Sequence, residues 1–281
     1  MEYLKAESVS EACELKDEYR DEAAFLSGGT DLIVDIREGD FDREYIIDIS
    51  DLQELSYVDV DDGTVRIGSV TKAVDIEGSD VLGSVPLLEK GFREFANPLV
   101  KNQATMGGNI ISASPAADMG PLLLVLDAEV TLRSVSGERT IPVYELFKGV
   151  KETSEEDDEL LTEISFDVPD GLLRNDFVKL SERDANAIST VSLAIMYDVV
   201  DGAFKDPRIG MGAVAITPIR AKETEDVLRG NEVSDDVIEE AKSVLRDEVS
   251  PISDVRGSKE YRREVSGELL GKALDETLEG F

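Results

Sequence analysis

Histidine and tryptophan are missing from the 281-residue sequence, and there is one cysteine, Cys13. Without histidine the chain cannot form a Ser-His-Asp or Cys-His catalytic site, and it offers no imidazole to a metal ion. A single cysteine excludes an internal disulfide and a cysteine-ligated iron–sulfur cluster. Cys13 itself lies in a helical pattern, and we expect it to be a small buried core residue. Any redox chemistry in this chain must therefore be carried by a bound organic cofactor.

Basic residues are also scarce, with 29 Lys and Arg against 62 Asp and Glu and a formal net charge of −33. Binding to nucleic acid or to an anionic membrane surface needs clustered positive charge, so both are excluded. The acidic residues are spread along the whole chain. Such a surface repels itself, and salt screens the repulsion. We therefore hypothesise adaptation to high salt; the alternative is an acidic protein without it.

Long apolar runs are absent as well. No stretch approaches the roughly 20 apolar residues that span a bilayer. Residues 1–7 show no basic region followed by an apolar stretch, so the sequence predicts no secretory signal and a cytoplasmic protein. The length suffices for two or three compact units, and an apolar content of 41% is ordinary for a globular chain.

The first informative motif is a glycine pair. A short apolar run leads into Gly28 and Gly29, and then into Thr30 and Asp31. This order is typical of a strand, a tight turn and the start of a helix. Backbone N–H groups in such a turn can bind phosphate, because they lack partners and the helix dipole adds partial positive charge. Glycine there permits a positive φ and close approach of a ligand to the backbone.

A second glycine pair, Gly107 and Gly108, lies among small and hydroxyl-bearing residues at 105–114. Each pair alone is also what an ordinary loop contains. Together they favour a ligand site in which two turns hold the two phosphates of a dinucleotide from opposite sides. This hypothesis requires Gly28 and Gly108 to lie close together in space.

Hydrophobic periodicity predicts an α+β protein. We expect a small parallel strand–helix–strand unit over 1–54, which begins with a capping box made by Ser8 and Glu11. A mixed α/β subdomain should cover 55–173, and a three-stranded antiparallel sheet with helices should form a C-terminal domain at 174–281. The boundary is expected at about 171–175. Strands are predicted at 25–27, 45–49, 55–60, 64–69, 130–133, 138–141, 161–168, 176–180, 189–200 and 203–217, and helices at 8–19, 30–36, 71 onward, 86–95, 117–126, 221–228, 234–248 and 259–278.

Two further segments resemble functional sites, one a metal site and the other a dinucleotide-binding turn, and the sequence argues against both. The acidic run at 152–159 is predicted to be a solvated loop rather than a metal site, because nothing in the sequence fixes its carboxylates. Residues 210–215 match the dinucleotide pattern G-x-G-x-x-A, which is meaningful only between a strand and a helix. This segment is predicted to continue as a strand through Thr217.

With both glycine turns present, the chain resembles the flavin-binding subunits of the molybdenum hydroxylases. That family includes the medium subunit of aerobic carbon monoxide dehydrogenase and the flavin domain of xanthine dehydrogenase. The resemblance covers nearly the whole chain. The segments that carry it are 27–32 for the first flavin motif, 104–110 and 114–118 for the second, 177–181 and 187–189 at the entry to the C-terminal domain, and 254–263 near the end.

The resemblance implies noncovalent FAD between an FAD-binding domain at 1–173 and the C-terminal domain. The lack of histidine agrees, because a histidyl attachment of the flavin is impossible. Backbone N–H groups of the first turn, and of Gly108 and Asn109, would hold the pyrophosphate. The implied cofactor-binding residues are Leu26, Ser27, Gly28, Gly29, Thr30, Asp31, Phe95, Thr105, Gly108, Asn109, Ser112, Asp118, Leu160 and Lys179.

Three of these residues have alternative interpretations. Asp118 would accept hydrogen bonds from FAD hydroxyls, or it caps a helix. Lys179 would stabilise charge at the polar edge of the flavin ring, or it is a solvated surface lysine. Phe95 would stack near the ring, or it belongs to the core face of a helix.

The resemblance also implies partners. Hydroxylation would take place at a molybdenum cofactor in a large partner chain, and iron–sulfur clusters in a small partner chain would deliver electrons to FAD in this one. FAD would then reduce an external acceptor, and we expect a dimer of heterotrimers. No catalytic and no metal-binding residue is expected in this chain. The alternatives are a self-contained flavin reductase or oxidase, and a noncatalytic scaffold that has lost FAD.

Overall fold

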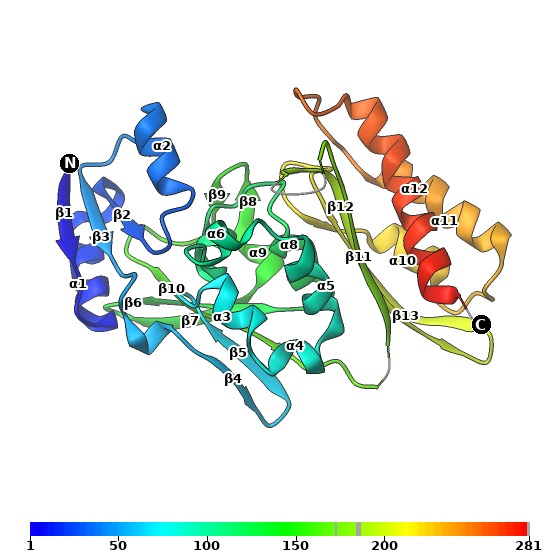
Figure 1. The fold of residues 1–281 in the computed structure, drawn as a ribbon, viewed down its shortest axis with the longest axis horizontal. Helices are drawn as coiled ribbons and strands as arrows, with labels where there is room; N and C mark the ends of the chain where they lie inside the picture. Colours follow the sequence, from blue (N-terminus) through cyan, green and yellow to red (C-terminus); the bar gives the residue numbers. More distant parts are fainter. Residues whose placement is uncertain (172, 184–186, 280–281) are drawn as a thin grey trace. The chain divides into compact units, whose positions relative to one another are not determined.

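The computed structural model describes residues 1–171, 173–183 and 187–279 (Figure 1). They form two compact units. Unit 1 comprises residues 1–82, 96–113 and 128–168, and unit 2 comprises 83–95, 114–127 and the chain from 169 onward. The division into domains at 1–173 and 174–281 remains a prediction, and Leu172 at its boundary lies outside the described residues.

The first part of unit 1 is the predicted parallel unit. Strands β1 (Glu2–Lys5), β2 (Ala23–Leu26) and β3 (Tyr45–Asp48) pair in parallel in the order β1-β3-β2, and helix α1 (Val9–Tyr19) connects the first two. The Ser8 side chain accepts from the Glu11 N–H, as predicted, but the Glu11 carboxylate accepts from Glu7 instead of Ser8. Cys13 is buried, which confirms its core position.

The second part of unit 1 is a five-stranded antiparallel sheet in the order β4-β5-β10-β6-β7. Burial alternates along β5 and β6, as in a sheet that has one face toward a core, whereas the middle strand β10 is buried at nearly every position. Examples are Val65 and Ile67 on β5 and Val130 and Leu132 on β6. The strands are β4 (Val58–Asp61), β5 (Thr64–Gly68), β6 (Glu129–Ser134), β7 (Gly137–Pro142) and β10 (Leu160–Asp167).

Short elements complete unit 1. A small hairpin precedes β10, and several helices are only one or two turns long. The helix expected from residue 71 onward is α3, which begins after Lys72. Thr71, the residue with a side chain suited to cap it, does not do so, because its hydroxyl accepts from the Tyr57 N–H and donates to the Tyr57 carbonyl. These elements are α2 (Leu32–Glu38), α3 (Ala73–Glu77), α6 (Pro98–Lys101), α7 (Met106–Ile111), α9 (Val143–Leu146), β8 (Phe147–Gly149) and β9 (Glu152–Thr153), with 3₁₀ turns at Arg20–Glu22 and Gln53–Leu55; α4 (Val81–Ser84) contains the junction with unit 2.

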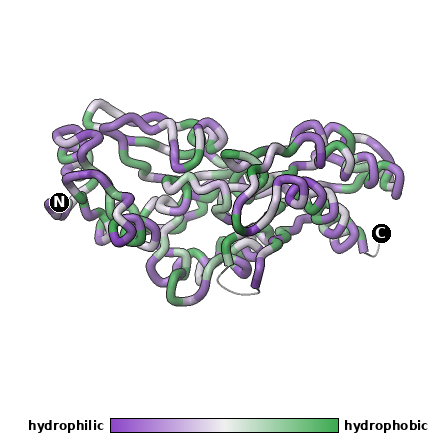
Figure 2. Tube along the Cα trace, turned by 90° about the horizontal axis from the view of Figure 1, so that it is seen from above, coloured by the Kyte–Doolittle hydropathy of each residue, from purple (hydrophilic) through white to green (hydrophobic). Residues whose placement is uncertain are grey.

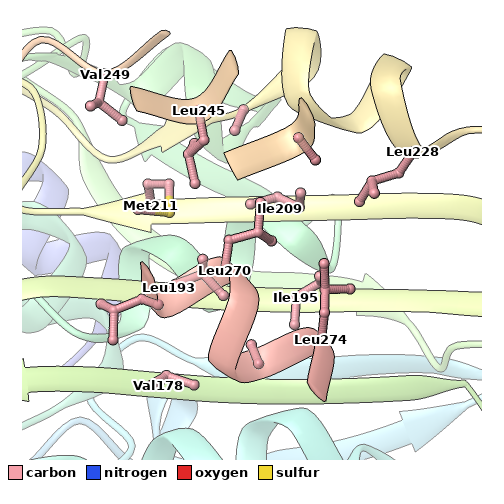
Figure 3. Packing of buried hydrophobic residues seen from close by; sticks show 14 of the residues in the cluster. Val178, Leu193, Ile195, Ile209, Met211, Leu228, Leu245, Val249, Leu270 and Leu274 are labelled. Carbon is pink, nitrogen blue, oxygen red and sulfur yellow. The ribbon is translucent and has the colours of Figure 1, made fainter. Parts of the chain in front are cut away.

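Unit 2 is built on an antiparallel sheet in the order β11-β12-β13-β14. The three predicted strands are present, and the short β14 adds a fourth. Figure 3 shows side chains from these strands, including Leu193 and Ile209, packed against Leu245 and Leu270 of the helices. The elements are β11 (Arg174–Ser181), β12 (Ser189–Val200), β13 (Ala203–Gly212), β14 (Ile219–Arg220), α5 (Pro86–Glu94), α8 (Met119–Val125), α10 (Lys222–Leu228), α11 (Asp235–Glu248) and α12 (Lys259–Leu278).

The sheet of unit 2 is covered on both faces, and this explains the G-x-G-x-x-A sequence. A Cβ on Gly210 would lie 2.3 Å from the Pro121 carbonyl oxygen, and one on Gly212 would lie 2.9 Å from Pro121 Cγ. The two glycines therefore let α8 pack closely on β13. The strand ends at Gly212, so its predicted continuation to Thr217 is wrong, but no helix follows and the segment is not a cofactor turn.

The acidic run at 152–159 differs from a solvated loop. Glu159 is only 8% exposed, and Arg139 binds both of its carboxylate oxygens at 2.7 Å. Burial alone would raise the pKa of Glu159, but the hydrogen bonds from Arg139 and the Glu156 N–H outweigh it and the pKa is lowered. Its carboxylate is thus fixed, by an arginine rather than a metal. Among the described residues no Asp, Glu or Cys cluster could hold a metal ion.

Hydrophobic and hydrophilic residues are interspersed along the drawn trace (Figure 2). Within the described residues, no helix combines the length and apolar character that a membrane span needs.

Candidate functional site

The first glycine turn connects β2 to α2. Gly29 has φ +68, which confirms the need for glycine at that position. None of the backbone N–H groups of the five residues from Ser27 to Asp31 donates a hydrogen bond within the described part of the chain. Five consecutive free donors form a segment that can bind an anionic oxygen.

The two glycine turns lie against each other, as the sequence hypothesis requires. The hydroxyls of Ser27 and Thr105 are 3.0 Å apart. A Cβ on Gly28 would lie 2.0 Å from the carbonyl oxygen of Gln103, which precedes the second turn. Position 28 therefore needs a glycine because the two chain segments contact each other there. From the sequence, this need had been attributed to the close approach of a ligand.

The second turn is different, because its backbone donors are already used. The Gly108 N–H donates to the Thr105 hydroxyl and the Asn109 N–H to the Thr105 carbonyl, as helix α7 begins. The Gly107 N–H donates to the Ser69 carbonyl, and a Cβ on Gly107 would lie 2.6 Å from the same oxygen. The expected donation by Gly108 and Asn109 N–H groups to a phosphate thus has no free donor here.

Side chains at the second turn do have unused capacity. The Asn109 Oδ1 atom and the Ser69 hydroxyl are buried and have no hydrogen-bond partner among the described residues. Buried polar atoms without a partner are rare and destabilising. A ligand with hydroxyl or N–H groups, together with a phosphate on the first turn, fits these atoms, and FAD carries both kinds of group.

A second group of predicted residues lies in unit 2, around a buried ion pair. The Lys179 ammonium is 2.7 Å from Asp118 Oδ2, and the two side chains are 4% and 8% exposed. The Ser189 hydroxyl donates to Asp118 Oδ1 at 2.7 Å, and Lys179 also donates to the Glu94 carbonyl at 3.2 Å. Asp118 occupies the N-cap position of α8, but its side chain makes no capping hydrogen bond and binds Lys179 and Ser189 instead. Lys179 is not solvated, so the interpretation of that residue as a surface lysine is wrong.

The electrostatic state of this pair follows from its burial. Burial raises the pKa of Asp118, and the charge and hydrogen bond of Lys179 reduce that rise only in part. Ser189 acts in the same direction as Lys179. Both neighbours therefore favour the ionised carboxylate, against the effect of burial.

The other predicted site residues have ordinary surroundings. Phe95 is 8% exposed and packs edge-to-face on Phe92 with ring centroids 6.2 Å apart, which favours the core interpretation. Leu160 is buried in the core of unit 1. Leu26, Ser27 and Ser112 are half-buried, and Thr30 and Asp31 are exposed. Thus unit 1 contains all the predicted residues except Phe95, Asp118 and Lys179, which unit 2 contains.

Three residues of the candidate site were not predicted from the sequence. Ser69 had no motif around it, because it comes directly after strand β5. Glu94 contributes only a backbone carbonyl, which no sequence pattern reveals. Ser189 lay inside a segment that carried the family resemblance, so that segment was the available signal for it.

Comparisons with known proteins agree along the whole chain. Residues 1–169 match the family model described as the FAD binding domain in molybdopterin dehydrogenase, and residues 176–277 match the CO dehydrogenase flavoprotein C-terminal domain. The glyceraldehyde dehydrogenase medium chain of Sulfolobus acidocaldarius is 36% identical over 276 residues, which cover 98% of this chain and 97% of the relative. The xanthine dehydrogenase FAD-binding subunit of Escherichia coli O157:H7 is 31% identical, with 98% and 95% covered.

The fold agrees with solved structures as well. A carbon monoxide dehydrogenase chain from Hydrogenophaga pseudoflava matches with a TM-score of 0.95 and 27% identity, and the match covers 99% of this chain and 96% of that one. These relatives do not favour a self-contained flavin enzyme or a flavin-free scaffold. The chain therefore belongs to the FAD-binding subunits of the molybdopterin dehydrogenases, a family of oxidoreductase flavoproteins that includes the carbon monoxide and xanthine dehydrogenase subunits.

Proposed function

We propose that this chain is the FAD-carrying electron-transfer subunit of a multi-subunit molybdenum-dependent dehydrogenase. One observation carries the proposal for the chain itself. Two glycine turns that are 78 residues apart in sequence meet through Ser27 and Thr105. One turn offers five unused N–H donors, and the other offers an unused buried acceptor on Asn109.

The residues of unit 1 would hold FAD through complementary groups. The N–H groups from Ser27 to Asp31 bind oxygens of the pyrophosphate, and Asn109 Oδ1 accepts from a hydroxyl or N–H group of the cofactor. The hydroxyls of Thr30, Thr105 and Ser112 can add donors. Bound FAD supplies a carrier that accepts and releases electron pairs, and the chain has no dithiol of its own to do so because it contains a single cysteine.

The residues of unit 2 would supply fixed charge. Lys179 is the residue that we assign to the polar edge of the flavin ring, where an ammonium stabilises added negative charge. Asp118 and the Glu94 carbonyl fix the position of that ammonium through its hydrogen bonds. An ammonium held in a dry site by short hydrogen bonds needs little reorganisation when neighbouring charge changes.

Partner chains follow from the names of the relatives and from composition. The relatives are named as a medium chain and as an FAD-binding subunit, so each is one chain among several. With one cysteine, this chain cannot ligate iron–sulfur clusters. We therefore propose a large chain with the molybdenum cofactor and a small iron–sulfur chain as partners, in a dimer of heterotrimers.

The experiment is reconstitution of the purified full-length chain with FAD. We expect bound flavin absorption that dithionite bleaches. Replacing Asn109→Leu should weaken FAD binding, whereas Asn102→Leu, an exposed position near the second turn, should not. A colourless protein that is indifferent to FAD would contradict the cofactor role. The assembly needs a separate test: if the chain isolated from the cells that naturally produce it carries no two further chains, the proposed assembly is wrong.

A further inference from the structure

Lys151 contacts the two segments that follow the glycine turns, although it is distant from both in the sequence. It lies between β8 and β9, and its ammonium contacts both carboxylate oxygens of Asp35 at 2.9 Å. Asp35 is on α2, the helix that follows the first turn. The Lys151 N–H donates to the Ala113 carbonyl at 3.1 Å, two residues beyond the end of α7, which begins at the second turn.

The backbone at both ends of this connection has a conformation that favours glycine. Lys151 has φ +57 and Ala113 has φ +41. Non-glycine residues adopt such angles only where surrounding contacts hold them. At Lys151 those contacts are the Asp35 carboxylate and the Ala113 carbonyl, so its side chain binds the helix that follows the first turn and its backbone binds the segment that follows the second.

Charge at the first turn gives the same residue a second role. The hydrogen bond that Lys151 donates to Asp35, together with the charges of Asp31, Asp35 and Asp40, raises the pKa of Lys151, although burial opposes the rise. These acids lie on or near the turn whose N–H groups we assign to a phosphate. Carboxylates beside a phosphate weaken its binding, and a neighbouring ammonium offsets them.

We propose that Lys151 is a positioning residue for the cofactor, which holds the two glycine turns in register and offsets the carboxylates of the first turn. This inference rests on the proposed function, because it concerns the same FAD site. It requires no contact between Lys151 and FAD. Neither the family match nor the sequence motifs point to this residue, which lies between β8 and β9, directly before the acidic run at 152–159.

The test is titration of the full-length apoprotein with FAD, with urea unfolding of the same apoprotein measured alongside. Lys151→Asn removes the ammonium but keeps a residue that adopts positive φ readily. Lys151→Arg keeps the ion pair with Asp35. Lys148→Asn is the matched control, because Lys148 is exposed on β8 and has no ion pair or hydrogen bond within the described ranges.

We expect Lys151→Asn to raise the Kd for FAD about 3- to 10-fold at low salt, and less in molar KCl, because salt screens the exposed pair. The unfolding midpoint of the apoprotein should change little. Lys151→Arg and Lys148→Asn should remain within about twofold of the wild-type Kd.

Three results have distinct meanings. If wild-type chain binds FAD and Lys151→Asn binds it equally well, the positioning role is wrong. If Lys151→Asn lowers the unfolding midpoint and leaves the Kd unchanged, Lys151 is merely structural and the inference is again wrong. If the wild-type chain does not bind FAD, the proposed function fails first.

Discussion

The ion pair between Lys179 and Asp118 should make unit 2 sensitive to the loss of either charge. Both side chains are at most 8% exposed, and their charged atoms are 2.7 Å apart. At an effective dielectric constant of about 20, Coulomb's law gives the pair about 6 kcal/mol of attraction. Desolvation of the two groups offsets most of it, so the intact pair contributes little net stability.

Removing one partner is a different perturbation, because the other charge stays buried without compensation. Lys179→Met and Asp118→Asn should each lower the free energy of unfolding by about 3–5 kcal/mol. The double variant Lys179→Met/Asp118→Asn leaves no buried charge, and the amide oxygen introduced at position 118 can still accept from Ser189. It should be less destabilised than the sum of the single variants by several kcal/mol, which is the coupling energy that a double-mutant cycle reports.

The protonation of Asp118 predicts how the destabilisation by Lys179→Met should change with pH. Burial already raises the pKa of Asp118, and loss of Lys179 would raise it further. When the pKa of a carboxyl is higher in the folded than in the unfolded state, the free energy of unfolding of the protein falls as the pH rises above the unfolded pKa of about 3.9. The destabilisation by Lys179→Met should therefore be small near pH 4 and grow toward pH 8.

Urea unfolding of the apoprotein followed by circular dichroism is the suitable assay, because the chain has no tryptophan. Lys5→Met is the control, since the Lys5–Asp51 pair is 51% and 71% exposed and solvent screens its attraction. Single variants of the buried pair that stay within about 1 kcal/mol of wild type, or that are additive in the cycle, would refute the reasoning.

Three further predictions concern other regions. Burial raises the pKa of Glu155 to about 7, so wild-type stability should fall as the pH rises from about 4.5 to 7. The Glu155→Gln variant should be more stable than wild type by about 1–2 kcal/mol at pH 8 and equal to it below pH 4.5. A difference in urea unfolding that does not depend on pH would contradict this. Gly28→Ala should separate the two turns and abolish FAD binding, while Gly83→Ala, whose Cβ meets open space, should bind FAD normally; retained binding in the first variant would show that the turns need not touch. Thermal midpoints should rise from low salt to molar KCl if the charge of −33 reflects adaptation to salt, and a flat response counts against that hypothesis.

The sequence by itself determined much of the local structure and the kind of site. The Ser8 cap, the hairpin at 58–68 and the three C-terminal helices depend on nearby residues, so local pattern was sufficient for them. Strand β1 was missed, because Glu2–Lys5 is mostly exposed and lacks apolar alternation. It forms only by pairing with β3, 43 residues further along the chain.

Only the tertiary structure decided what each candidate residue contacts. The reason for Gly28 lies in the Gln103 carbonyl, and the carboxylate of Glu159 is held by an arginine 20 residues earlier. From the sequence, Asp118 could be a helix cap and Lys179 a solvated lysine, and only the fold brings their charged atoms together in a dry site. Glycines and hydroxyls mark a turn because their effect on the backbone is local. The partner of a charged side chain is set by the packing of distant segments, which no short stretch of sequence contains.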